Sequence, residues 1–250
     1  MKGVSRVSFV RNLVRRIIYK ENATSDLLVS YLKKHGAEIG SDVIFFAPNK
    51  TFIDKQNPYL LKIGNHVRIT EGVKILTHDY SWSVLKLYSS DTINEGAILG
   101  SQSAVEIGNN VFIGMNAIIT CGVTIGNNVI IGAGSVVTKN CEPDGVYAGV
   151  PAKRIMSIEE FYKKRSSLQF EEARSLALHY RSAFGTEPNK SIFKEYFMLF
   201  CSNEEAAKVD IFKKQMETSE NYDACMEYMK NNKPMFESFE SFLNTCYDRN

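Results

Sequence analysis

Imidazole is the one side chain that titrates near neutral pH without help from its surroundings, so the four histidines are the first candidates for acid–base chemistry. They are His35, His66, His78 and His179. His35 ends a segment with helical spacing, and His66 falls inside a regular repeat, so both are expected at the surface. His179 lies in a helical region and is expected to be structural. His78 stands where the repeat breaks off, and it is the candidate general base that could take a proton from a hydroxyl group.

The five cysteines form neither a metal-binding nor a disulfide pattern. They are Cys121, Cys141, Cys201, Cys225 and Cys246. No two of them have the CxxC spacing of a zinc site or a redox pair. An odd number of cysteines in a chain of this length is typical of reduced thiols in a cytoplasmic protein. The sequence therefore predicts no metal centre and a cytoplasmic location.

A six-residue repeat positions these side chains. From Ile107 to Glu142 the chain reads IGNNVF, IGMNAI, ITCGVT, IGNNVI, IGAGSV and VTKNCE. A period of six fits neither an α-helix nor a single strand. It suits a short strand followed by a tight corner, with three units making one triangular coil and coils stacking on each other. Gly and Asn supply the corner backbone. Because Cys141 falls on an interior position, it is expected to be a core thiol and not a nucleophile.

The repeat is interrupted beside His78. The same register runs through Ile63, Ile69 and Ile75, with a weaker unit at Ile39, and it resumes near Val105. The excursion at about 79–104 is too long for a coil corner, and long departures from a regular scaffold are usually functional.

Two residues of the excursion are candidates for contact with the molecule that carries the hydroxyl group. Trp82 is the single tryptophan, and its ring could stack on a sugar or anchor the loop. Asp79 follows His78 directly. Asp79, Asp91 and Glu95 are all possible carboxylates for orienting the imidazole.

The repeat, the motif ILTHDYS and the stretch IGAGSVVTKN…YAGVPAKRI together resemble the hexapeptide-repeat acyltransferase superfamily. Within it, they are similar to galactoside, maltose, nodulation-factor and capsule-polysaccharide O-acetyltransferases. The resemblance covers about residues 37–156. It implies a mainly β fold, a left-handed parallel β-helix, with an N-terminal helical segment at 1–36 and a C-terminal α-helical extension at 157–250. The handedness comes from the resemblance alone.

The resemblance also implies a reaction. Acetyl-CoA would be the co-substrate, no metal would be needed, and the acetyl group would pass directly to a sugar hydroxyl with His78 as general base. The coenzyme would lie between adjacent prisms of a homotrimer. The cofactor-binding residues carried over are Met115 and Ala133 for the pantetheine arm, Thr138 and Lys139 for its phosphate end, and Lys153 and Arg154 for the adenosine phosphates. Cations on a rigid turn suit these phosphates.

The two flanks differ in charge. Residues 1–36 carry eight Lys and Arg against two acidic residues, a net charge of +6. Within them, residues 4–20 form a basic amphipathic pattern that could make weak contact with an anionic membrane surface, or pack on the chain's own domain or a partner subunit. Residues 157–250 carry thirteen basic and sixteen acidic residues, a net charge of −3. The net charge of the whole chain, +2, argues against nucleic-acid binding.

Helical spacing and two capping boxes, Ser157-x-x-Glu160 and Ser202-x-x-Glu205, define the C-terminal extension. They predict helices at about 158–166, 168–184, 190–201, 203–216, 221–231 and 234–246.

The favoured function is O-acetylation of a sugar or surface polysaccharide. The alternatives are N-acetylation of an amino-sugar nucleotide or an antibiotic, and a non-catalytic β-helix scaffold. A γ-type carbonic anhydrase would need three zinc-binding histidines, and only His66 and His78 fall in the repeat region.

Overall fold

The structure is a computed structural model that describes residues 14–248 of the chain. It contains two compact units, which divide between Phe161 and Tyr162. The first unit contains the hexapeptide repeat and the second is helical.

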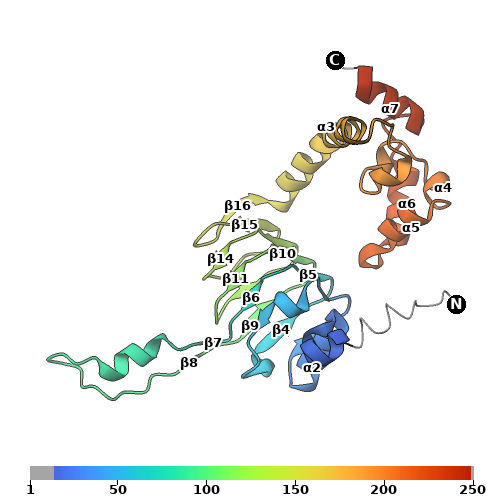
Figure 1. Cartoon of the computed structure of the whole chain (residues 1–250). Helices are drawn as coiled ribbons and strands as arrows, with labels where there is room; N and C mark the ends of the chain where they lie inside the picture. The colour runs from blue at the N-terminus through green and yellow to red at the C-terminus, as the bar shows by residue number, and fades with distance from the viewer. Residues whose placement is uncertain (1–13, 249–250) are drawn as a thin grey trace. The chain divides into compact units, whose positions relative to one another are not determined.

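The repeat region is a parallel β-helix with three sheets as its faces (Figure 1). The first sheet holds β1 (Glu38–Ile39), β4 (Leu61–Ile63), β9 (Val105–Ile107) and β12 (Thr124–Ile125). The second holds β2 (Ile44–Phe45), β5 (Val67–Ile69), β10 (Val111–Ile113), β13 (Val129–Ile131), β15 (Gly145–Ala148) and the antiparallel β16 (Lys153–Ser157). The third holds β3 (Phe52–Ile53), β6 (Lys74–Ile75), β11 (Ile118–Ile119) and β14 (Val136–Val137). The chain visits the three sheets in turn, which is the coil that a period of six predicts.

Branched side chains stacked along the prism axis fill its interior. In the first sheet Ile63 pairs with Ile107, and Ile107 pairs with Ile125, and all three are buried. Cys141 continues this column through a bridge to Ile125, and its burial raises the pKa of the thiol to about 11. The expectation of a core thiol at Cys141 is confirmed.

One corner of the prism explains why Asn recurs in the repeat. Asp42, His66, Asn110, Asn128 and Asp144 all have φ between 49° and 57°, a conformation that Asn and Asp tolerate better than most residues. Their side chains also connect the coils. The Asn110 side-chain amide donates to Asn128 at 2.8 Å, and the Asn128 amide donates to Asp144 at 2.8 Å. We call this column the corner ladder.

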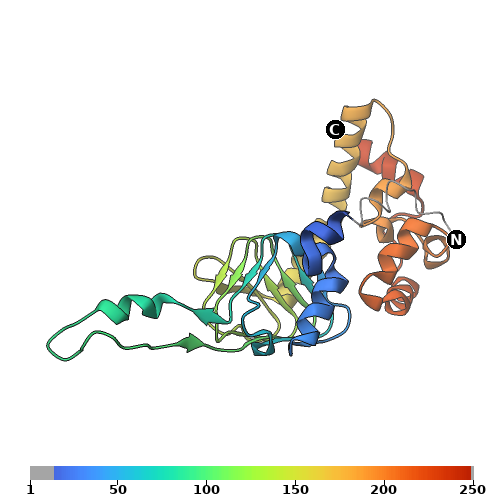
Figure 2. The ribbon, with the colours of Figure 1, turned by 60° about the horizontal axis from the view of Figure 1, so that its bottom comes forward.

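An arm leaves the prism between the second and third coils. Its base is an antiparallel pair of β7 (His78–Asp79) and β8 (Ser101–Gln102), and the 3₁₀ helix η4 (Ser81–Leu87) lies beyond it. Figures 1 and 2 show the arm reaching well away from the prism in both views.

Short helices precede the first coil. Residues 14–19 are helical, and η1 (Lys20–Ala23) and α2 (Ser25–Lys34) follow. Leu28 and Leu32 of α2 join the prism core. Two 3₁₀ helices, η2 (Pro48–Lys50) and η3 (Pro58–Leu60), lie in the first coil and in the connection to the second. Residues 4–13 of the predicted basic helix fall outside the described residues.

The helical unit is built on α3 (Ile158–Phe184), which begins at the Ser157–Glu160 capping box: the Glu160 N–H donates to the Ser157 hydroxyl at 3.1 Å, and the Ser157 N–H donates to the Glu160 carboxylate at 2.7 Å. The remaining elements are η5 (Lys190–Phe193), η6 (Phe197–Leu199), α4 (Asn203–Ala206), α5 (Asp210–Glu217), η7 (Thr218–Glu220), α6 (Tyr222–Asn231) and α7 (Phe239–Asp248). Phe193, Phe200, Phe212 and Phe242 are buried at its centre.

Several predicted boundaries in this unit are wrong. No break occurs near residue 167, because Ser166 and Ser167 lie within a helix that continues to Phe184. The segment 190–201 forms two short 3₁₀ helices, since its phenylalanines pack inward from irregular backbone. The helical share of 43% against 19% strand makes the chain mixed rather than mainly β. None of the helices found between residues 14 and 248 has the length and apolar character of a membrane span.

The stacked interior predicts that truncating an inward-facing side chain lowers the stability more than truncating an outward-facing side chain on the same strand. Ile125→Ala removes a buried side chain and should lower the free energy of unfolding by about 2–5 kcal/mol, measured by urea denaturation. Thr124→Ala on the same strand is the control, because its side chain is exposed, and it should cost less than about 1 kcal/mol. Equal losses would contradict the packing described here.

Candidate active site

His78 lies against a buried carboxylate that the sequence did not single out, Asp54. Strands β3 and β6 are parallel neighbours, so the residues that follow them come side by side. The Asp54 backbone N–H donates to the Ile75 carbonyl at 3.0 Å, which places Asp54 beneath the segment that carries His78. The His78 Nδ1 and the Asp54 Oδ2 form a short hydrogen bond.

The protein holds Asp54 as an ion. The residue is 3% exposed, and its Oδ2 accepts hydrogen bonds from the Thr77 hydroxyl at 2.7 Å and the Thr77 N–H at 3.2 Å. Its Oδ1 accepts one from the Gln56 N–H at 3.0 Å. Burial by itself raises the pKa of Asp54, but the donors from Gln56, Thr77 and His78 outweigh it and lower the pKa below its ordinary value.

An ionised Asp54 dictates the form of His78. A carboxylate only accepts hydrogen bonds, so Nδ1 must carry the proton in this pair and the lone pair of the neutral ring is on Nε2. The His78 side chain is 34% exposed, so the ring is open to solvent while Asp54 is buried. This arrangement provides an oriented base that can take a proton from outside the prism.

Asp79, one of the three carboxylates considered for orienting His78, forms its hydrogen bonds with Ser81, and the ring is bonded to Asp54. Asp79 accepts hydrogen bonds from the Ser81 N–H at 2.8 Å and the Ser81 hydroxyl at 3.0 Å, and Ser81 is the first residue of η4. The Ser81 N–H is also the main cause of the lowered pKa of Asp79. Asp91 and Glu95, the other two carboxylates considered, lie in the exposed part of the arm.

Asp54 was missed because the first coil is irregular. Phe45 and Ile53 are eight residues apart where a regular coil has six, so the sequence register does not align Asp54 with the later units. A carboxylate directly after an interior Ile, at a position where most units have Gly or Thr, was the available signal.

Trp82, the other candidate acceptor contact, lies at the base of the arm. Its ring meets the Tyr80 ring edge-on, with 4.9 Å between the centroids, and is partly exposed. Contact with an acceptor by Trp82 and Asp79 stays a prediction.

The residues expected to bind the coenzyme fall on two corners and one end of the prism. Met115 and Ala133 occupy equivalent corners of successive coils, where the Gly134 N–H donates to the Met115 carbonyl at 2.7 Å. Thr138 and Lys139 follow β14, at the same corner at which Asp54 and His78 follow β3 and β6.

Lys153 and Arg154 begin the antiparallel β16 at the end of the second sheet. The Arg154 guanidinium donates to the Asp144 carbonyl at 2.9 Å, which fixes its position on the turn. The side chains of Met115, Thr138, Lys139 and Lys153 are all exposed, as is Arg154. Met115 precedes β11 and His78 follows β6. Since both strands belong to the third sheet, this sheet lies between the Met115 corner and the His78 corner.

A second histidine–aspartate pair lies on the corner ladder. His66 Nδ1 is 3.0 Å from the Asp42 Oδ2, and Arg68 Nη2 is 2.6 Å from the same oxygen. Burial by itself raises the pKa of Asp42. Hydrogen bonds from Arg68 and His66 outweigh burial and lower this pKa below its ordinary value. Because Asp42 already neutralises a guanidinium, this pair is a structural tie between the first two coils.

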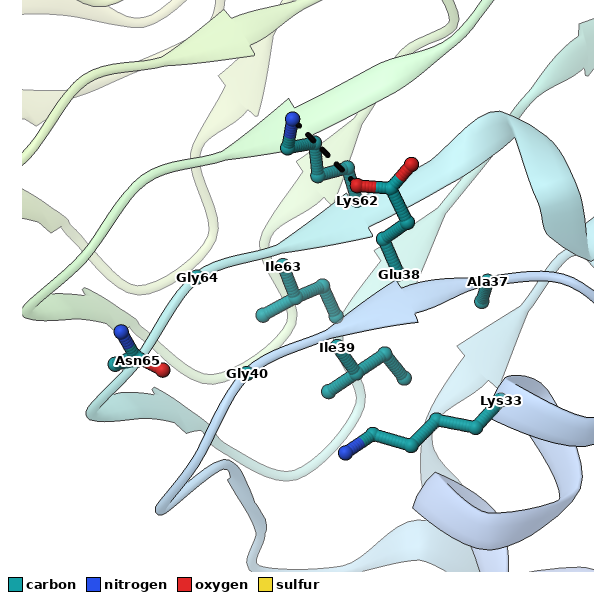
Figure 3. Close-up of a pocket in the computed structure, with 9 residues that line it drawn as sticks. All are labelled: Lys33, Ala37, Glu38, Ile39, Gly40, Lys62, Ile63, Gly64 and Asn65. Atoms are coloured by element: carbon teal, nitrogen blue, oxygen red, sulfur yellow. Dashed lines mark ion pairs between the residues drawn. The ribbon is translucent and has the colours of Figure 1, made fainter.

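The prism also has an open hollow at the edge of its first coil (Figure 3). Its volume is about 530 Å³, and it lies over the Gly40 and Gly64 corners beside the Glu38–Lys62 ion pair, whose charged atoms are 3.6 Å apart. It shares no residue with the His78–Asp54 pair, and no histidine or cysteine lines it. Across residues 14–248 no three His, Cys, Asp or Glu side chains gather as a metal site.

Comparison with known proteins places this repeat in a family. Residues 104–139 match the model for the bacterial transferase hexapeptide (six repeats). Over 148 residues the chain is 43% identical to protein CapG of Staphylococcus aureus. The aligned region covers 59% of this chain and 78% of CapG. The chain belongs to the hexapeptide-repeat transferase family. The predicted membership of this acyltransferase superfamily is confirmed, and with it the expectation of a left-handed β-helix.

Two solved acetyltransferase structures are similar to part of this chain. A galactoside acetyltransferase in complex with coenzyme A is 24% identical, with a TM-score of 0.42, over 65% of this chain and 88% of that one. Serine acetyltransferase of Neisseria gonorrhoeae is 25% identical, with a TM-score of 0.36, over 49% of this chain and 38% of that one. The chain thus spans well under half of the serine acetyltransferase. At these scores the family relation rests on the sequence matches.

The buried Asp54 carboxylate predicts a pH-dependent contribution to stability. Because its pKa is lowered in the folded protein, the stabilisation is present above the unfolded pKa of about 4 and is lost as the pH falls through the folded value. Asp54→Asn should lower the free energy of unfolding by about 1–3 kcal/mol at neutral pH, and the difference from wild type should shrink below about pH 4.

The measurement is urea denaturation at a series of pH values. Asp91→Asn, in the exposed arm, is the control and should leave the profile unchanged. A difference between Asp54→Asn and wild type that stayed constant down to the lowest pH would argue against an ionised Asp54.

Proposed function

We propose that this protein is an acetyl-CoA-dependent O-acetyltransferase that acts on a hydroxyl of a sugar or surface polysaccharide, with His78 as general base. The observation that carries the proposal is the His78–Asp54 pair, a partly exposed imidazole held by a buried carboxylate at the base of the arm in a hexapeptide-repeat prism. The relation to CapG and to the hexapeptide transferases supplies the reaction class.

The proposed reaction needs one imidazole. Nε2 of His78 takes the proton of the acceptor hydroxyl while the oxygen attacks the thioester carbonyl of acetyl-CoA. The carbon–sulfur bond breaks, and the departing coenzyme A thiolate takes the proton from the His78 imidazolium. Asp54, already ionised, stabilises the imidazolium between these steps and fixes the ring that receives the proton. In this scheme no acyl-enzyme forms, and the buried thiol of Cys141 takes no part.

The coenzyme would run along the third face of the prism. Met115 and Ala133 would contact the pantetheine arm, and Thr138 and Lys139 are on the corner that leads toward His78. Lys153 and Arg154 would meet the adenosine phosphates, which carry several negative charges and favour cations on a rigid turn.

The arm supports a homotrimer with sites between subunits. Its apolar side chains lie open to solvent in the single chain: Val84, Leu87, Ile98 and Leu99 are each more than half exposed, and Leu87 is 83% exposed. Apolar side chains gathered on one projecting segment are expected to be covered by another surface. A neighbouring prism would cover them and enclose the acceptor near Trp82 and Asp79.

The cellular setting follows from the proposed substrates. Acetyl-CoA is a cytoplasmic metabolite, so we propose that the protein acts in the cytoplasm on a glycan precursor before export. The resemblance of the repeat and the ILTHDYS motif to capsule-polysaccharide O-acetyltransferases makes a capsule-type glycan the first acceptor class to test.

Loss of His78 should abolish most of the activity. His78→Ala should lower kcat by roughly 10²–10⁴-fold with acetyl-CoA and a panel of sugar acceptors, followed by release of the coenzyme A thiol. The matched control is His66→Asn, which removes the other histidine–aspartate pair and places Asn in a ladder position that Asn110 and Asn128 already occupy. The control should keep nearly full activity. Equal turnover in wild type and His78→Ala would refute the assignment.

The cations proposed for the coenzyme should act on its binding. Lys139→Ala and Lys153→Ala should each raise the KM for acetyl-CoA several-fold with little change in kcat, and the effect should weaken at high salt. Lys62→Ala is the control, since Lys62 pairs with Glu38 on the first sheet. A KM that moved as much in the control would rule out the proposed groove.

A further inference from the structure

The helical segment that leads into η1 presents apolar side chains to solvent. In residues 14–19, Val14, Ile17 and Ile18 follow the i, i+3, i+4 spacing of one helix face. Ile17 is 68% exposed and Ile18 is 63% exposed. None of the three belongs to the apolar core of the prism. These three side chains therefore do not pack on the core of the prism.

Basic residues accompany this apolar face. Arg15 and Arg16 alternate with it and are exposed, and Lys20 follows at the start of η1. The first 36 residues carry eight basic and two acidic residues, a net charge of +6. Like charge of this density disfavours pairing of the segment with a copy of itself, while it favours an anionic surface. An exposed apolar face flanked by Arg is the pattern of a helix that lies in the interface of a bilayer.

The segment is fastened to the part of the prism that carries the candidate site. Lys55 Nζ contacts Glu21 at 2.6 Å and Asn22 at 2.8 Å, and Ala23 is fully buried. Lys55 directly follows Asp54. Two residues further on, the Asn57 amide donates to Gln102 of the arm at 3.0 Å. A surface bound by residues 14–19 would therefore lie on the side of the prism where the arm begins.

We propose that residues 14–19, together with Lys20, dock the protein on a bilayer rich in anionic lipids, next to the corner that holds His78 and Asp54. The docking does not depend on the proposed reaction. It would bring the site to acceptors held at a membrane surface.

The test uses the full chain and vesicles of phosphatidylcholine, with and without phosphatidylserine, in a co-sedimentation assay. The wild type should bind only the vesicles that contain phosphatidylserine. Ile17→Asp/Ile18→Asp should weaken binding at least tenfold, and Arg15→Gln/Arg16→Gln should weaken it roughly 25-fold, about fivefold for each charge.

Lys33→Gln/Lys34→Gln is the matched control. It removes the same charge from the last turn of α2, away from the apolar face, and should weaken binding several-fold less than Arg15→Gln/Arg16→Gln. Equal losses in the two double variants, or binding without phosphatidylserine dependence, would overturn the proposal. So would a change in the molar mass of the assembly on Ile17→Asp/Ile18→Asp, measured by light scattering, because the face would then join copies of the chain. Acetyl transfer to a soluble sugar should be unchanged in all three, which separates this proposal from the catalytic one.

Discussion

Stacking of one coil on the next is the constraint on which the rest of the molecule depends. A single triangular coil cannot bury its own interior side chains, so Ile63, Ile107 and Ile125 reach full burial only as a column. The backbone hydrogen bonds between coils fix the vertical register at every strand. Whatever follows the same strand of successive coils must therefore lie in one line along the prism.

The candidate site is a direct product of that register. Asp54 and His78 are 24 residues apart in sequence. They meet because β3 and β6 are paired and each residue follows its strand by a few positions. The interior Ile anchors each strand, and the corner beside it is free to carry polar side chains. Such a site sits on rigid elements, which keeps an imidazole oriented without a mobile loop.

The comparison of the two histidine–aspartate pairs shows how surroundings set the role of one motif. The Asp54 carboxylate accepts hydrogen bonds from uncharged groups of Thr77 and Gln56. Its pair with His78 contains no permanently charged cation. Asp42 is bound by Arg68, which supplies a permanent positive charge beside it. The Asp54 carboxylate is thus left to the His78 ring and uncharged donors, whereas the Asp42 carboxylate is shared between His66 and a guanidinium. The first pair suits proton transfer and the second ties two coils together.

The sequence by itself determined the period of six, the interior positions, the excursion after Ile75 and the choice of His78, because each follows from the order of residues along the chain. The capping boxes likewise located the start of α3 from four adjacent residues. The continuous course of α3 past residue 167, and the 3₁₀ turns of the phenylalanine-rich segment, were decided by packing within the helical unit. The sequence also did not identify Asp54 as the partner of His78, because the irregular first coil obscured the alignment of the two residues. Only the pairing of β3 with β6 brought that carboxylate under the ring, and the hydrogen bonds from Gln56, Thr77 and His78 outweighed burial and kept it ionised.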